Sequence, residues 1–342
     1  MAKSTVGVEI TEESVRAVEL TTGRSPSVVT AGEVPLPRDA AKDSEVLDPD
    51  AVAVALRQLW SGAGIRNRKV TLGVGSRRIL VREYTTQAMR PDLLREALPF
   101  QVQDLLPVPV SQAVLDFYPF AQQGDQVTGL LVAAVSESIE QLIATLAKAK
   151  LEVDNVDLVP FGLARVAKRV AKPGETVAMI HIGDHTSHVV AVTDGIPHFV
   201  RIIPVDVATT AARREELAFA APEFELDALL ETVPPQPFST RASMRTTAAA
   251  SAPAAGDLVA RLRSTIAFFG SRPGAPAIST AWVSGAGYAA PGVADTLSRS
   301  FDVPVLPVRL DQFADTGKHG LPEELSLNAV ATAGILLGEV SR

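Results

Sequence analysis

The feature that most constrains this chain is an internal repeat. Residues Val6–Gly23 align without a gap on residues Ala178–Gly195, an offset of 172 positions in a chain of 342 residues. In each copy, two runs of alternating apolar residues are separated by a polar turn, and a second polar turn ends in glycine. Alternation of this kind is typical of β-strands, and a third such run follows each copy, at 27–34 and 199–203. A meander that recurs once in each half of the chain predicts two lobes of similar topology.

Strand and helix patterns alternate along the rest of the chain, which indicates a mixed α/β fold. Further strands are predicted at 70–74, 79–84, 114–120, 129–135, 151–158, 281–284 and 303–308. Helices are predicted at 51–60, 91–106, 138–150, 161–170, 257–271, 293–301 and 327–340. Asp48 and Pro49 supply a start for the first helix, because an acidic N-cap followed by proline favours the first turn. Pro99 is expected to break or kink the second, since a proline inside a helix removes a hydrogen bond.

The segment Pro222–Gly256 differs in composition from the rest of the chain. It is rich in Ala, Pro, Ser and Thr, and it contains the run Pro234–Pro237. Such a composition does not bury enough apolar surface to offset the entropy lost on ordering. We expect a mobile insertion at 222–256 that a protease cleaves faster than the flanking lobes, with the next ordered helix starting at Asp257.

Composition excludes several classes of function. The chain has no cysteine, which excludes disulfides, thiolate metal sites and cysteine nucleophiles. Its formal net charge of −7 provides no basic surface for a nucleic acid, so we expect no nucleic-acid partner. No apolar run approaches the length of about 20 residues that a spanning helix needs. We expect a cytoplasmic protein that meets a membrane only through a partner.

Several motifs together resemble a known family. Ser284–Gly287, between a predicted strand and a predicted helix, is similar to the adenosine loop of the actin-like ATPase fold. Other matching segments are Val81–Glu83, Met89, Leu93–Ala97, Phe100, Leu106–Pro109, Leu115–Phe117, Val159–Arg165 and Ile180–Gly183. They resemble the PilM family of cytoplasmic actin-like proteins of type IV pilus assembly, a family related to the cell-division protein FtsA. The resemblance covers nearly the whole chain except 222–256.

The resemblance implies a two-lobed actin-like fold of the duplicated ribonuclease-H-like type, with an inserted FtsA/PilM-type subdomain. The first lobe is expected to comprise 1–85, 153–172 and 327–342. The inserted subdomain is expected at 86–152, and the second lobe at 173–326 with the mobile insertion. In such a fold the two hairpin turns face each other across one cleft.

The resemblance also implies a nucleotide site in that cleft, with ATP and Mg²⁺ as cofactors. The residues that match it are Glu9, Thr11 and Glu12 in the first turn, Gly183, Asp184 and Thr186 in the second, and Gly285, Ala286 and Gly287 in the adenosine loop. A phosphate loop needs converging backbone N–H groups, which favour glycine, and an acidic residue that holds magnesium through water. No catalytic residue is assigned.

The two turns depart from this pattern. In the first, Glu9 replaces the family's Asp, Thr11 replaces its glycine, and Glu12 adds a negative charge where phosphate oxygens would lie. In the second, His181 replaces the acidic residue, and a neutral imidazole is a poor magnesium ligand. We therefore expect weak, magnesium-dependent ATP binding and negligible hydrolysis. No metal site is expected from the nearby histidines, because they do not share one helix face.

The resemblance implies a partner similar to PilN, a single-span inner-membrane protein whose short cytoplasmic tail docks in a groove beside the inserted subdomain. Other pilus assembly proteins are expected partners as well. Apolar candidates for the groove are Leu80, Leu94, Phe100 and Leu105. An extended tail would gain main-chain hydrogen bonds and pocket contacts there. The function expected is a scaffold at the cytoplasmic face of the inner membrane, with a degenerate ATP cleft.

Two alternatives stay open on the sequence. One is an FtsA-like, membrane-tethered, polymer-forming protein, which would need a C-terminal amphipathic helix after the closing helix. The other is an active ATPase or sugar-kinase-like phosphotransferase of the same fold. That activity would need an Asp general base and an intact first phosphate loop, and neither is evident in the sequence.

Overall fold

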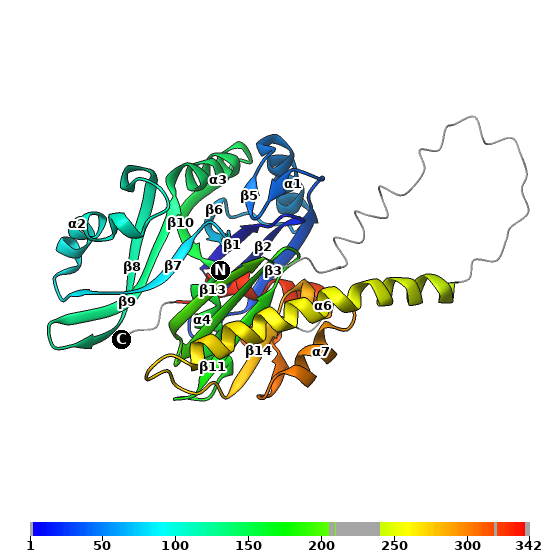
Figure 1. The fold of residues 1–342 in the computed structure, drawn as a ribbon. Coiled ribbons are helices and arrows are strands. Elements are labelled where there is room, and N and C mark those ends of the chain that lie inside the picture. The colour runs from blue at the N-terminus through cyan, green and yellow to red at the C-terminus, as the bar shows by residue number, and fades with distance from the viewer. Residues whose placement is uncertain (1–2, 205–208, 210–239, 318–319, 339–342) are drawn as a thin grey trace, which may run out of the picture.

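The computed structural model describes residues 3–204, 209, 240–317 and 320–338, and each half of the chain carries a five-stranded sheet (Figure 1). The first sheet has the order β10-β6-β1-β2-β3. Its strands are β1 (Ser4–Ile10), β2 (Ser14–Thr21), β3 (Val28–Pro35), β6 (Lys69–Val74) and β10 (Glu152–Leu158). Helices α1 (Pro49–Gly62) and α3 (Ser136–Lys148) pack on its outer face and enclose a core that includes Val8, Leu56 and Leu146. As predicted, Asp48 caps α1 by accepting from two backbone N–H groups of its first turn.

The second sheet repeats this arrangement, with the order β13-β12-β11-β14-β15. Its strands are β11 (Thr176–Ile182), β12 (Thr186–Thr193), β13 (Ile196–Pro204), β14 (Thr280–Ser284) and β15 (Val305–Pro307). Helices α6 (Thr240–Gly270) and α7 (Val293–Ser300) cover its outer face. In both sheets two antiparallel pairings link the first three strands, and two parallel pairings then add one strand each. The internal repeat is therefore confirmed as two sheets of equal topology.

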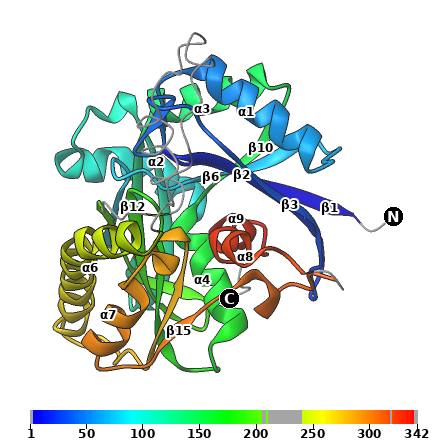
Figure 2. The same ribbon diagram turned by 90° about the vertical axis from the view of Figure 1, so that its right-hand side faces the viewer.

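Two helices lie between the sheets, as Figure 2 shows. They are α4 (Val159–Val170) and α9 (Val330–Gly334), and α9 follows α8 (Glu323–Asn328). Their apolar side chains share one core with β2, β11 and β12, which joins the two halves. The single closing helix predicted at 327–340 is wrong in this respect, because two short helices meet at Ala329, and the last residues of that prediction lie outside the described part of the chain.

A third sheet lies to one side of the first (Figure 1). Its strands have the order β7-β9-β8, with β7 (Leu80–Gln87), β8 (Ala113–Gln123) and β9 (Gln126–Val135). Helix α2 (Pro91–Val102) packs on it through Leu98 and Val102, and continues through Pro99. Because β7 belongs wholly to this sheet while α3 packs in the core of the first lobe, we propose that the inserted unit runs from β7 to β9.

Only the second part of the segment expected as an insertion, from residue 240 on, lies within the described residues. Residues 222–239 lie outside the described residues, whereas α6 begins at Thr240. The prediction that the helix starts at Asp257 is therefore wrong. The physical reason is the alanine-rich stretch before Asp257, since alanine has the highest helix propensity of all residues. The remaining short elements are β4 (Ala41–Lys42), β5 (Glu45–Val46), η1 (Gln103–Leu105), η2 (Val110–Gln112), η4 (Ala286–Ala289) and η5 (Leu310–Gln312).

Candidate functional site

The two hairpin turns meet across the interlobe cleft, as the repeat predicts. In the first turn the backbone N–H of Thr11 donates to the carbonyl of Ser14 at 2.9 Å. In the second turn the N–H of Gly183 donates to the carbonyl of Thr186 at 3.0 Å, which is the same bond 172 residues later. Glu13 and His185 join the two turns, with Oε1 and Nε2 2.6 Å apart.

A cavity of about 40 Å³ remains between the turns. Seven of the nine residues that the sequence assigned to a nucleotide site line it, and Gly285 and Gly287 do not. A volume of this size has room for two or three water molecules at about 15 Å³ each. Sites for organic ligands are larger, at roughly 300–1,000 Å³.

Glu9 lies near the end of β1, where it is buried and lines the small cavity. Its Oε2 accepts a hydrogen bond from the hydroxyl of Thr332 in α9. Gly73 on β6 faces the same side chain, because a Cβ built there would lie 2.8 Å from the Cγ of Glu9. Burial raises the pKa of Glu9, although the charge of Arg16 acts in the opposite direction. The carboxyl group is thus engaged by α9, and its position is fixed by packing.

Arg16 on β2 is the centre of a buried charge cluster that the sequence did not reveal. Its side chain is 3% exposed and pairs with Glu33 of β3 at 3.0 Å. Its Nη1 also donates to the backbone carbonyl of Asn328 in α8 at 3.2 Å. Burial acts to raise the pKa of Glu33, but Arg16 and hydrogen bonds from Ser14 and Asn328 outweigh burial and lower it to about 2. Glu33 is therefore ionised, and Arg16 carries its counter-charge.

The second turn contributes a different set of buried groups. Asp184 accepts from the hydroxyl of Thr209, and burial raises its pKa while Arg16 acts to lower it. The imidazole of His181 is 2.9 Å from the hydroxyl of Ser284 and that of His188 bonds the carbonyl of Gly75 at 2.9 Å.

The imidazoles of His181 on β11 and His188 on β12 are both uncharged at pH 7. Burial lowers the pKa of His181, with His188 and Arg16 adding to the effect. Burial also lowers the pKa of His188, to about 4. Both histidines are buried, at 5% and 6% exposed. Within the described chain, no three His, Asp or Glu side chains gather as a metal-binding group.

The other first-turn residues make their hydrogen bonds within their own lobe. The hydroxyl of Thr11 bonds the backbone of Ser14 in both directions, at 3.0 and 3.1 Å. The carboxylate of Glu12 accepts from the backbone N–H of Asp43 at 3.0 Å, so it faces the β4–β5 hairpin.

The glycines of the predicted adenosine loop allow a close approach, but to the protein itself. Gly285 has φ +93°, and a Cβ there would lie 2.2 Å from the carbonyl oxygen of Ile182. A Cβ on Gly287 would lie 2.2 Å from the Cγ2 of the same Ile182. Ala286 is the member of this loop that lines the cavity. The glycine requirement is thus explained by packing against the end of β11.

The four apolar candidates for a partner groove are not brought together. Leu80 lines a groove between lobes, and Leu94 lines a separate pocket under α2. Phe100 is 78% exposed on α2, whereas Leu105 is partly buried against the small core of the inserted unit.

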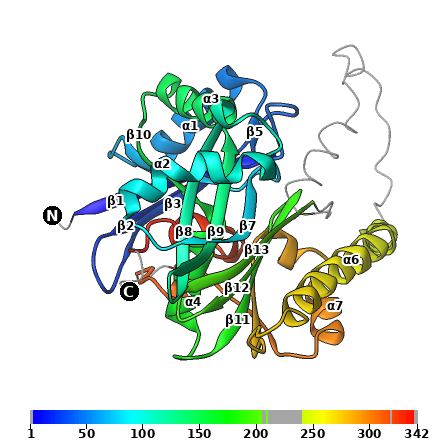
Figure 3. The same cartoon turned by 60° about the vertical axis from the view of Figure 1, so that its left-hand side comes forward.

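The groove that contains Leu80 has a volume of about 490 Å³ and lies where three parts of the chain meet. It is lined by the start of β7, by Pro107 and Val108, and by 200–202 of β13. Figure 3 shows β13 beside the strands of the inserted sheet. In the described chain β7 pairs only with β9, and β13 only with β12. Within the described residues, the groove is therefore bordered by two strand edges that no other strand pairs with.

Three arginines border this groove, which we call the strand-edge groove. Arg77 forms an ion pair with Asp43, and Arg78 forms one with Glu45 at 2.6 Å. Arg201 on β13 is exposed and makes no ion pair within the described residues. One cation is therefore available at the rim.

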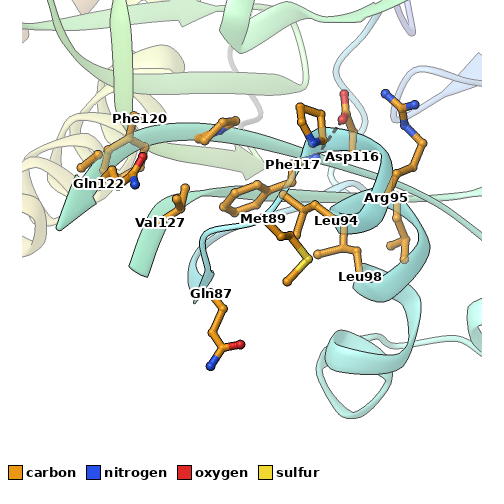
Figure 4. Close-up of a pocket in the computed structure, with 14 residues that line it drawn as sticks. Gln87, Met89, Leu94, Arg95, Leu98, Asp116, Phe117, Phe120, Gln122 and Val127 are labelled. Atoms are coloured by element: carbon orange, nitrogen blue, oxygen red, sulfur yellow. Dashed lines mark hydrogen bonds between the residues drawn. The ribbon is translucent and has the colours of Figure 1, made fainter. Parts of the chain in front are cut away.

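The pocket under α2 has about 410 Å³ and a lining that mixes apolar side chains with Gln87, Arg95, Asp116 and Gln122 (Figure 4). Met89, Leu94, Leu98 and Phe117 lie close together at its centre. One wall of the pocket is β8, the outer strand of the three-stranded sheet. On this strand the N–H of Phe117 donates to the side chain of Asp116 at 2.8 Å, and the nearby Pro119 has no N–H. An added strand would find no free donor at these positions, which disfavours strand pairing along this part of the edge.

Comparison with known proteins decides the family. Residues 7–202, more than half of the chain, match the family described as type IV pilus assembly protein PilM. The chain belongs to the PilM family. Membership supports a role in type IV pilus assembly, and the motifs that carried the resemblance lie within the matched residues except for the adenosine loop.

Solved structures agree on the fold. A chain of the PilM–PilN type IV pilus biogenesis complex superposes with a TM-score of 0.78 at 23% identity, covering 97% of each chain. The ethanolamine utilization protein EutJ from Carboxydothermus hydrogenoformans gives a TM-score of 0.54 at 14% identity, covering 99% of this chain and 91% of that one. The PilM-family chain thus has the fold of the actin-like ATPases, as predicted. No helix among the described residues is long and apolar enough to span a bilayer.

ATP and Mg²⁺ do not fit the residues that the structure places in the cleft. Magnesium requires octahedral oxygen ligands and keeps several waters, whereas Glu9 is turned to Thr332 and Asp184 to Thr209. The cavity of about 40 Å³ is far smaller than a nucleotide. The guanidinium of Arg16 already lies among the carboxylates.

One signal in the sequence could have found the missed cluster. Under the repeat, Arg16 aligns with His188 and Glu9 aligns with His181. In the first hairpin Glu9 lies directly opposite Arg16 on the neighbouring strand. In the second hairpin His181 lies opposite His188 in the same way. Ionisable residues at matched positions inside two apolar strands indicate a buried polar cluster, because burial of an unpaired charge is costly. Glu33 and Thr332 carry no such signal.

Proposed function

We propose that this chain is a cytoplasmic actin-like scaffold of type IV pilus assembly, which docks the cytoplasmic tail of a PilN-like inner-membrane protein in the strand-edge groove. The observation that carries the proposal is the difference between two cavity volumes. The strand-edge groove has about 490 Å³, whereas the interlobe cleft has about 40 Å³. The similar solved complex, in which PilM is paired with PilN, supports the choice of partner. Contact with the membrane is through that partner alone.

The groove suits an extended peptide. A strand added to an open edge gains main-chain hydrogen bonds, and alternate side chains enter the adjacent pocket. Leu80, Val81 and Val108 supply the apolar wall of that pocket. The exposed Arg201 supplies a cation for a carboxylate of the tail or of its flanking residues. The proposed tail is therefore an extended segment with apolar anchors and at least one acidic residue.

The proposal includes a degenerate ATP cleft. The side chains that the sequence matches to phosphate and magnesium contacts are instead bonded to this chain's own groups, as Glu9 and Asp184 illustrate. Hydrolysis of ATP is expected to be negligible, and docking of the tail is expected to need no nucleotide. These features separate the scaffold from an active ATPase or a sugar-kinase-like phosphotransferase.

The experiment is calorimetric titration of the full chain with a synthetic peptide of the partner's cytoplasmic tail. Leu80→Asp places a charge in the groove and is expected to weaken binding by at least about tenfold, since burying an unpaired carboxylate costs more than about 1.4 kcal/mol. Leu94→Asp makes the same change in the pocket under α2 and is the matched control, with affinity within about twofold of wild type. Unchanged affinity in Leu80→Asp, or an equal loss in Leu94→Asp, would overturn the strand-edge groove as the docking site.

Two further measurements address the alternatives. Release of phosphate from ATP, followed with wild type and Glu9→Ala, is expected to stay at background in both. A turnover that Glu9→Ala abolishes would establish an active ATPase and remove the scaffold proposal. Sedimentation of the purified chain with lipid vesicles and no partner tail tests the FtsA-like alternative, for which pelleted filaments would be the decisive result.

A further inference from the structure

The charges around Arg16 do not belong to one element or to one lobe. Glu33 of β3 pairs with it from the first lobe, and Glu9 of β1 and Asp184 of the second turn line the same cavity as Arg16. Among the described residues that line the cavity, Arg16 is the one arginine or lysine. A single permanent cation therefore lies among three carboxyl groups contributed by both lobes.

The guanidinium is fixed in this place by several bonds. Its Nη2 pairs with Glu33, and its Nη1 donates to the carbonyl of Asn328, at the end of α8. Asn328 donates in turn to Glu33 at 3.4 Å, which closes a ring of contacts. The Nε of Arg16 is buried and has no hydrogen-bond partner among the protein's described atoms, and neither has the Nδ1 of His188 on the opposite strand pair. A donor and an acceptor are thus left without a partner on two residues that line the small cavity, which suits bound water.

We propose that the interlobe cleft is an ionic clasp, in which Arg16 supplies from within the chain the positive charge that Mg²⁺ supplies in a nucleotide cleft. A guanidinium is charged at every physiological pH and does not dissociate, unlike a metal ion. The clasp consists of Arg16 with Glu9, Glu33 and Asp184, together with the Glu13–His185 contact at the rim. It holds the two lobes closed without any ligand.

The same charges also disfavour a nucleotide with its magnesium ion in the cleft. A triphosphate would bring several negative charges beside Glu12, Glu13 and Asp184, and repulsion between like charges at short range is strong in a buried site. Displacing Arg16 to admit magnesium would leave Glu33 without its partner, and breaking a buried pair is strongly destabilising. The inference rests on the proposed degenerate cleft and adds a defined role for Arg16. It is independent of where the tail docks.

The test measures the distance between the lobes. Because the chain has no cysteine, the pair Ser61→Cys on α1 and Ser298→Cys on α7, both exposed, accepts two spin labels at defined positions. Pulsed electron resonance then reports the distribution of distances between outer helices of the two lobes. For the otherwise wild-type chain we expect one narrow distribution that millimolar Mg²⁺, Mg–ATP or inorganic phosphate leaves unchanged.

Arg16→Met is expected to broaden that distribution toward longer distances, and Arg16→Lys, which keeps a cation, to restore most of the narrow peak. The matched control is Arg165→Met, which removes another buried arginine pair, with Asp157, away from the turns. It is expected to lower thermal stability while leaving the distance unchanged. A shift of the otherwise wild-type distribution by Mg–ATP overturns the proposal, and so does a narrow distribution in Arg16→Met.

Each failure can be assigned to its own proposal. If Arg16→Met does not fold, the Mg–ATP titration of the otherwise wild-type pair and Arg16→Lys still decide the clasp. Tail titration is run on the same samples. If the tail still binds but Mg–ATP changes the distance between the lobes, the clasp alone is overturned. If Mg–ATP leaves the distance unchanged but the tail does not bind, the docking proposal alone is overturned.

Discussion

The two hairpins have the same backbone hydrogen bonds, but different side chains stand at the matched positions that face the cleft. Thr11 and Gly183 make the same closing bond, and the strand pairs Glu9–Arg16 and His181–His188 occupy the same register. In the first hairpin the pair is an acid and a base, with Glu9 bonded to Thr332 of α9 and Arg16 to Asn328 of α8. In the second hairpin both members are buried, and burial lowers the pKa of each imidazole.

The difference shows how a duplicated unit acquires two roles. Backbone hydrogen bonds require only the turn geometry, so they persist through exchange of side chains. The side chains, by contrast, face each other across the cleft, where like charges would repel. At the rim of the cleft the first hairpin presents a carboxylate and the second an imidazole, so that Glu13 meets His185 rather than a second carboxylate. The space between the turns is thereby filled by the protein, and larger open space lies away from the turns, as in the strand-edge groove.

The largest expected effect comes from the matched positions Arg16 and His188. Arg16→Met leaves the partly buried Glu33 without its partner and removes the cation from the carboxyl groups around it, and is expected to lower the free energy of unfolding by about 3–4 kcal/mol. His188→Met removes one hydrogen bond, to the carbonyl of Gly75, and is expected to cost about 1–2 kcal/mol. Urea unfolding near neutral pH measures both. Equal losses would mean that the two hairpins contribute alike, contrary to the comparison.

The closing positions of the two turns give the next effect. Gly183→Ala places a Cβ 2.7 Å from the carbonyl oxygen of Thr186, a backbone atom that moves only with the turn. We expect a loss of about 2–3 kcal/mol, as for other overpacked sites. Thr11→Ala removes side-chain bonds to Ser14 and is expected to cost about 1 kcal/mol. Thermal unfolding of both variants checks the order, which a larger loss in Thr11→Ala would reverse.

Much of the fold could be predicted from the sequence because its signals are local. The repeat, the alternation of the strands and the cap of α1 at Asp48 are each written in adjacent residues, and the structure confirms them. The start of α6 could not be placed by apolar content, because the helix propensity of alanine carries the helix beyond the apolar pattern. The closing helix was predicted as one piece, although α8 and α9 meet at Ala329 as separate helices.

The candidate site could be predicted only in part. The turn residues follow from the repeat, so their meeting across the cleft was foreseeable. The partners of Glu9 and Arg16 come from α8 and α9, more than 300 positions away in the chain, and no local pattern announces them. Glycines illustrate the same limit, because Gly285 and Gly287 look like ligand-binding residues until Ile182 is seen beside them. Side-chain direction, not residue type, separates a filled cleft from an open one.

The third effect is a dependence on pH that belongs to the second hairpin. Burial lowers the pKa of His188 from 6.5 to about 4, so the folded state resists protonation while the unfolded chain accepts it. Stability from this group is present above about pH 6.5 and falls as the pH falls toward 4. Between about pH 7 and pH 5 the loss is about 2 kcal/mol. Glu33, with a pKa lowered to about 2, loses its contribution only at more acidic pH.

The variant that tests this is His188→Gln, whose amide nitrogen reaches the position of the ring Nε2 and still donates to Gly75. Unfolding is measured in urea at both pH values for wild type and variant. The fall in stability between them should be smaller in the variant by about 2 kcal/mol. An unchanged fall would show that His188 is not the group that resists protonation, and the contrast between the hairpins would then rest on Arg16 alone.

The smallest effect is expected where the hairpins touch. Glu13 and His185 form a contact at the rim of the cleft, and the His185 side chain is 24% exposed. Partly exposed pairs of this kind are worth about 0.5–1 kcal/mol. A double-mutant cycle with Glu13→Gln, His185→Gln and the double variant isolates the coupling from the other contacts of each residue. A coupling near zero would leave the closure of the lobes to the buried charges, whereas one above about 2 kcal/mol would make the rim contact, rather than Arg16, the main element of the clasp. Because neither group contributes to the strand-edge groove, the affinity for the partner tail should stay the same in all four proteins, and a change in it would show that the cleft and the groove are coupled.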